Sequence, residues 1–215
     1  MTESDVTLTD YAVALECALL TGLLYRSPPA RRHLRRLFAL FFVSVGLAAL
    51  AGGTVHGFFL RDDSITGAVL WRIALIALGL TAFAVWSIGA RLLFREGKAR
   101  VIEAVAGAEC VAYLVVVLAI DPRFWIAILN YAPAVVFLAI SLSTLYRRQR
   151  QRPVLAGLIG LALAIVAAIV QQRQIVLHPV YFNHNALYHG IQMVSLFLIF
   201  LAARHLISVP AAAEG

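Results

Sequence analysis

The chain has 215 residues, of which 62% are hydrophobic and only 13% carry a formal charge. An ordinary soluble domain carries about twice that share of charged residues, so the composition excludes this class. In a soluble protein, the net charge of +7 would suggest binding to nucleic acid. Here the basic residues are spread over the connectors between apolar segments, so we expect no nucleic-acid partner.

Seven apolar segments follow one another along the chain. A helix needs roughly 20 largely apolar residues to cross a bilayer, and the segments are close to that length. The connectors are short and leave no room for a second domain. We therefore expect residues 1–215 to form a single all-α domain, a polytopic integral membrane protein with seven transmembrane helices. Their approximate bounds are 7–25, 37–60, 66–94, 101–120, 124–146, 153–170 and 185–207.

The basic residues alternate between the two sides of this arrangement. Fourteen of the eighteen lie in the first, third and fifth connectors and at the C-terminal end, against three in the other connectors. The positive-inside rule then places the N-terminus outside and the C-terminus in the cytoplasm. Because the N-terminal residues lack a basic region and a small-residue cleavage site, we expect the first segment to be retained as a helix. Arginine outnumbers lysine seventeen to one, a bias typical of GC-rich bacterial genomes, which suggests a bacterial inner membrane.

Polar side chains lie inside the apolar segments and gather toward their outer ends. By a rise of 1.5 Å per residue, His56 and His189 lie roughly 6–8 Å below the outer end of their segments. Glu16 and Glu109 lie roughly 13–16 Å deep by the same rise. Polar groups at membrane depth are costly unless partnered and mark functional sites. We therefore expect a polar cavity that opens outward. Its other members are Asp10, Arg72, Asn130, Asn185 and Gln192.

The seventh segment opens with the densest polar group of the chain. Asn185, His189 and Gln192 share one face of a helix, because they are four and three residues apart. His184 points about 140° away from His189 in the same helix. Either Asn183 or Asn185 could cap the helix start.

Imidazole is the commonest protein ligand for zinc, and a catalytic zinc site has three protein ligands and one open position. His56 and His189 could supply two of these ligands, with His184, Glu16 or Asp10 as the third. Glu16 or Glu109 could act as the catalytic general base or orient an imidazole. Arg72 is expected to form an ion pair with one of these two glutamates.

The pattern resembles the seven-helix transmembrane hydrolase superfamily of the alkaline ceramidases and the adiponectin/progestin receptors. The resemblance is carried by Gly-Gly-Thr-Val-His, ending at His56, and Asn-Ala-Leu-Tyr-His, ending at His189. The acidic residues Asp10 and Glu16 match the acidic start of the first helix. The resemblance implies an N-out, C-in bundle, a zinc cofactor held by three histidines, and hydrolysis of a lipid amide or ester.

This chain departs from the superfamily pattern at three points. The supporting serine is replaced by Gly52, the first histidine of the seventh-helix pair by Asn185, and the third segment contains no aspartate. His56 and His189 carry over, and a third ligand does not. Three functions stay open: a zinc-dependent membrane hydrolase, a small transporter or ligand-binding receptor without catalysis, and a structural or accessory membrane protein. The expected partners are the lipid bilayer and a lipid or small-molecule substrate.

Overall fold

The computed structural model describes residues 3–26, 28–59, 64–178 and 183–209, and its regular structure in these ranges is helical. With each π-helical turn joined to the helix before it, seven helices of the described part are long and apolar enough to cross a membrane, as predicted. The elements in chain order are α1 (Ser4–Arg26), α2 (Arg32–Thr54), the π-helical turn η1 (Val55–Phe59), α3 (Ile65–Leu93), α4 (Glu96–Val115), the π-helical turn η2 (Val116–Ile120), α5 (Phe124–Gln149), α6 (Arg152–Gln172) and α7 (His184–Ser208).

The helices extend beyond the predicted apolar segments, chiefly at the basic connectors. Helix α2 begins at Arg32 and α4 at Glu96, each five residues before the predicted start. Apolar patterning marks only the apolar part of a helix, whereas arginine and glutamate are good helix formers and continue it. The predicted end of the second segment, residue 60, lies outside the described residues.

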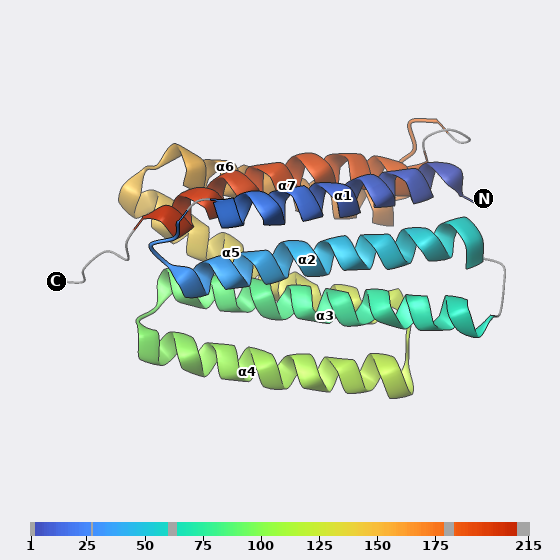
Figure 1. The fold of residues 1–215 in the computed structure, drawn as a ribbon, viewed down its shortest axis with the longest axis horizontal. Coiled ribbons are helices and arrows are strands. Elements are labelled where there is room, and N and C mark those ends of the chain that lie inside the picture. The colour runs from blue at the N-terminus through green and yellow to red at the C-terminus, as the bar shows by residue number, and fades with distance from the viewer. Residues whose placement is uncertain (1–2, 27, 60–63, 179–182, 210–215) are drawn as a thin grey trace.

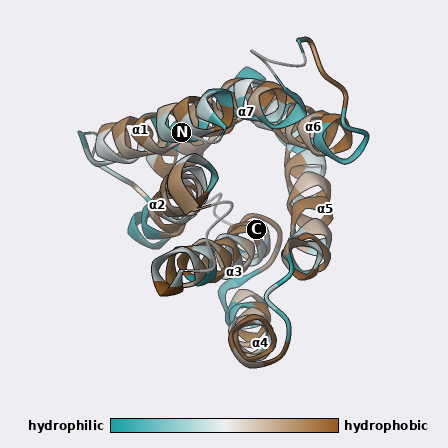
Figure 2. Ribbon diagram, turned by 90° about the vertical axis from the view of Figure 1, so that its right-hand side faces the viewer, coloured by the Kyte–Doolittle hydropathy of each residue, from teal (hydrophilic) through white to brown (hydrophobic). Residues whose placement is uncertain are grey.

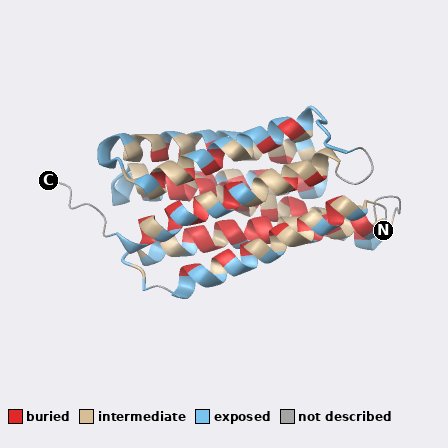
Figure 3. Cartoon of the chain, turned by 90° about the horizontal axis from the view of Figure 1, so that it is seen from above, coloured by how far each residue is buried: buried red, intermediate tan, exposed pale blue. Residues whose placement is uncertain are grey.

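Successive helices run up and down, so that every odd-numbered helix starts at the same end of the bundle (Figure 1). Seen along this axis, the helices surround the middle of the bundle, and α4 lies outside, against α3 (Figure 2). Helix α1 packs against α2 and α7, and α6 packs closely against α7. The buried residues face the interior, while much of each outer helix surface is exposed (Figure 3). Large apolar side chains such as Phe42, Leu24 and Ile88 form the core.

The two ends of the bundle differ in chemistry. We call the end where α1, α3, α5 and α7 begin the N-terminal end, and the opposite one the basic end. At the basic end, the Arg91 guanidinium donates to both carboxylate oxygens of Glu103, over 2.6 and 2.5 Å. Glu103 also contacts His33 Nε2 at 3.0 Å. These contacts join α2, α3 and α4, and they hold the peripheral helix α4 on the bundle.

Candidate functional site

The buried face of α1 carries acidic residues at its first turns and apolar residues after them. Val6, Asp10, Val13 and Cys17 are buried at alternating spacings of four, three and four residues. Glu3 lies seven residues before Asp10 and so continues the same face toward the N-terminal end. Helix α1 therefore presents two carboxylates to the helices on which it packs.

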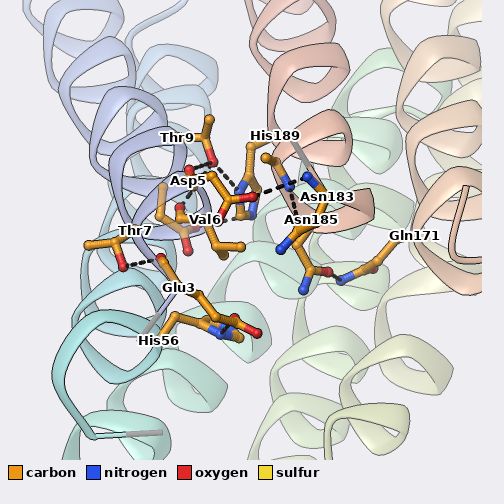
Figure 4. A network of polar contacts seen from close by, with 12 residues as sticks. Glu3, Asp5, Val6, Thr7, Thr9, His56, Gln171, Asn183, Asn185 and His189 are labelled. Carbon is orange, nitrogen blue, oxygen red and sulfur yellow. Dashed lines mark hydrogen bonds and ion pairs between the residues drawn. The ribbon is translucent and has the colours of Figure 1, made fainter. Parts of the chain in front are cut away.

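His189 of α7 contacts two adjacent residues of α1, Thr9 and Asp10, and Figure 4 shows its imidazole beside Thr9. Its Nε2 is 3.1 Å from Asp10 Oδ1, and its Nδ1 is 3.0 Å from Thr9 Oγ1. Both His189 and Asp10 are buried. A buried charge needs a partner, and here the imidazole and the carboxylate partner each other. The ring of Tyr188 meets the imidazole edge-on at 5.0 Å.

A second imidazole–carboxylate pair lies closer to the surface of the same end. His56 belongs to the π-helical turn η1, and its Nδ1 is 2.7 Å from Glu3 Oε2. The side chains of His56 and Glu3 are 25% and 30% exposed, against 10% and 7% for His189 and Asp10. π-helical turns often occur at functional sites. The two pairs therefore form a shallow and a deep layer of one polar site.

Two glycines of the α2–η1 segment let α1 approach closely. A Cβ added at Gly53 would lie 2.6 Å from Asp10 Cβ, and one at Gly57 would lie 2.8 Å from Thr7 Oγ1. A Cβ added at the neighbouring Gly52 would meet no atom within 4 Å. The lack of a side chain at Gly53 and Gly57 thus sets the spacing between α1 and α2 at the depth of the site.

The start of α7 is fixed by α1 and by its own cap. Asn183 is the N-cap: its side-chain oxygen accepts from the backbone N–H groups of Asn185 and Ala186. The backbone N–H of Asn183 donates to Asp5 Oδ2 at 3.1 Å. Of the two predicted caps, Asn183 is therefore the one used. Asn185 instead accepts a hydrogen bond from Gln171 of α6 at 3.3 Å.

The two predicted catalytic glutamates lie away from these pairs. Glu109 belongs to α4, the peripheral helix, which packs chiefly on α3. Glu16 lies six residues beyond Asp10, deeper in the bundle, and contacts neither imidazole. In each of them the Oε2 atom is buried and has no hydrogen-bond partner among the described residues. The same holds for both polar atoms of the Asn130 side chain.

The expected ion pair of Arg72 is absent from the described part of the chain. Its guanidinium donates instead to the carbonyl of Ala68 in its own helix, at 3.3 Å. Arg72 is therefore not the partner of Glu16 or Glu109. His184 is the first residue of α7, and neither its side chain nor that of Gln192 makes a hydrogen bond or ion pair with another described residue.

The described residues do not fit the zinc ion that the resemblance implies. They contain no group of three histidine, cysteine, aspartate or glutamate side chains placed to hold a metal. Both ring nitrogens of His189 already contact α1, and His56 faces Glu3. A three-ligand site needs its nitrogens to converge on one point. We therefore derive no reaction step through zinc.

Three residues at this end, Glu3, Asp5 and Thr9, were not among those predicted for the site. The signal that finds Glu3 is its heptad spacing from Asp10 on the buried face of α1. Thr9 has no comparable signal, because its partner comes from a helix 180 residues later in the chain.

Residues 6–208 match a family of unknown function (DUF6962), and the chain belongs to this family. No curated protein and no solved structure matches the chain. A function therefore has to be inferred from the geometry of the N-terminal end.

Proposed function

We propose that this member of the family is a multi-pass protein of the cell membrane, in bacteria the inner membrane, with the N-terminus outside and the C-terminus in the cytoplasm. Seven helices of spanning length and apolar character support the membrane location. The arginine-rich connectors at the basic end support the orientation, because cytoplasmic loops are enriched in arginine and lysine. The His189–Asp10 and His56–Glu3 pairs then face outward.

We further propose that this end is the binding site of a small transporter or receptor for a polar solute. The observation that carries the proposal is the buried His189–Asp10 pair inside apolar helices. Histidine and acidic residues in such segments mark ion and solute pathways. The more exposed His56–Glu3 pair lies at the same end and supports access from the aqueous side.

Solute-dependent unfolding of the purified full chain in lipid nanodiscs tests this proposal. A panel of small organic cations, anions and neutral polar solutes is titrated while the thermal unfolding midpoint is followed. We expect one class to raise the midpoint saturably, because a ligand that binds only the native state stabilises it. Asp10→Asn and Glu3→Gln should weaken this binding about tenfold, the loss of one charge-assisted hydrogen bond. Glu109→Gln is the control and should leave it unchanged.

Two other results would favour the alternatives. If no solute shifts the midpoint and Asp10→Asn only lowers stability, the polar pairs serve to join helices, as in an accessory protein. If the wild-type chain instead retains one zinc ion that His56→Ala and His189→Ala lose, a metal-dependent lipid hydrolase is favoured. Elemental analysis of the same samples provides this comparison.

A further inference from the structure

The hydroxyl of Thr9 has one hydrogen and three acceptors within reach. Its Oγ1 lies 2.9 Å from the carbonyl oxygen of Asp5, 3.0 Å from that of Val6, and 3.0 Å from His189 Nδ1. If the hydrogen points to a carbonyl, Oγ1 can only accept from the ring, so His189 carries a hydrogen on Nδ1. If it points to Nδ1, that nitrogen must be bare. The orientation of the hydroxyl therefore decides the tautomer of His189.

Because of the contact at the second ring nitrogen, the two arrangements also differ in the number of protons that His189 and Asp10 hold together. His189 Nε2 lies 3.1 Å from Asp10 Oδ1. With a hydrogen on Nδ1, a hydrogen bond at Nε2 needs one more proton, held by Nε2 or by Asp10, and the pair is then electrically neutral. With Nδ1 bare, Nε2–H donates to an ionised Asp10, and the pair carries one negative charge.

From this geometry we infer that the Asp10–His189 pair is a binding site for one exchangeable proton and that Thr9 is its positioning residue. On release, the Nδ1 hydrogen leaves as a proton, the hydrogen shared between Nε2 and Asp10 ends on Nε2, which donates to the ionised Asp10, and the Thr9 hydroxyl turns from its backbone acceptor to Nδ1. The inference rests on the proposed function, because exchange with the outside requires that this end face outward.

Other titratable groups surround the pair on each helix that packs against it. The His56 imidazole is within electrostatic range of His189. It lies with its partner Glu3 in the more exposed layer, between the pair and the surface. The groups from the packed elements are Glu3 just before α1, Asp5 and Tyr11 on α1, His56 on η1, and His184 and Tyr188 on α7.

Nitrogen NMR of the full chain in lipid nanodiscs, labelled with ¹⁵N in its histidines, tests the inference. The His189 signals are assigned by their loss in His189→Gln and followed as the pH is raised. We expect His189 to carry a hydrogen on Nδ1 at low pH and on Nε2 alone at high pH. Thr9→Val should lower the midpoint of this change by about one pH unit, because the valine removes two hydrogen bonds from the proton-bound form and only one from the proton-free form. Thr9→Ser should restore the wild-type midpoint.

Thr7→Val is the matched control. Thr7 makes the same helical contact, from its Oγ1 to the carbonyl of Glu3, but does not contact His189. A Thr7→Val midpoint equal to wild type, with a shifted Thr9→Val midpoint, supports the inference. A single tautomer of His189 over the whole pH range overturns it, as does a Thr9→Val midpoint equal to wild type. Solute binding is measured separately, so a solute that binds through Asp10 while His189 keeps one tautomer overturns this inference and leaves the proposed function standing.

Discussion

At the scale of single residues, the two partly buried glutamates of α4, Glu103 and Glu109, differ in their partners. Glu103 is held by Arg91 on two sides, whereas Glu109 has a buried Oε2 without a hydrogen-bond partner among the described residues. An unpaired ionised carboxylate is very costly in apolar surroundings, so we expect Glu109 to carry a proton. The apolar reagent dicyclohexylcarbodiimide adds to protonated carboxyl groups. We therefore predict an adduct on Glu109 and none on Glu103, read by mass spectrometry of the digested chain.

Glu103 is a strict internal reference, because it lies on the same helix about 9 Å away along the axis. Glu109→Gln should remove the adduct without creating another on α4. Equal modification of both glutamates would contradict the expected difference in protonation.

Some residues of the site could be predicted from their identity and position in the sequence. His56, His189 and Asp10 were found because a polar residue inside an apolar segment is conspicuous in sequence. The contact between His189 and Asp10 could not be predicted in the same way. A carboxylate can bind either a metal or an imidazole, and which of the two it binds depends on how closely α1 approaches α7. The predicted partnership of Arg72 failed for a related reason: depth along a helix says nothing about the direction in which a side chain points.

At the scale of elements, the site depends on the close contact of α1 with α2. Gly53→Ala would place a Cβ 2.6 Å from Asp10 Cβ and force the two helices apart. We predict a loss of about 1–3 kcal/mol in the free energy of unfolding, the usual cost of overpacking. The substitution should also change the His189 nitrogen signals, because Asp10 would move away from the imidazole. Chemical unfolding in micelles and NMR measure the two effects.

Gly52→Ala is the matched control for this prediction, on the same helix and one residue away. No atom lies within 4 Å of its added Cβ, and alanine is the better helix former by about 1 kcal/mol. This variant should be as stable as wild type or more so, with unchanged His189 signals. If Gly53→Ala had the same stability and His189 signals as Gly52→Ala, the close approach of α1 to α2 would not depend on the missing side chain at Gly53.

Elements were more predictable than contacts. The seven helices follow from the apolar segments alone, and their ends were misplaced chiefly where charged residues prolong a helix past its apolar part, as at Arg32. The π-helical turn that carries His56 has no counterpart in the apolar pattern. Neither the peripheral place of α4 nor the contact of α1 with α7 could be read from periodicity, because both depend on how the helices are arranged around the bundle.

At the scale of the whole molecule, the contrast between the acidic N-terminal residues and the basic opposite end predicts the orientation in the membrane. Ser4 and Ser208 are exposed at opposite ends of the bundle, and the two native cysteines, Cys17 and Cys110, are buried. In a Cys17→Ala, Cys110→Ala background, Ser4→Cys should react with a membrane-impermeant maleimide in intact spheroplasts. Ser208→Cys should react only after lysis, since arginine-rich ends remain in the cytoplasm. The reverse pattern would turn the His189–Asp10 pair toward the cytoplasm and remove the basis for an outward-facing site.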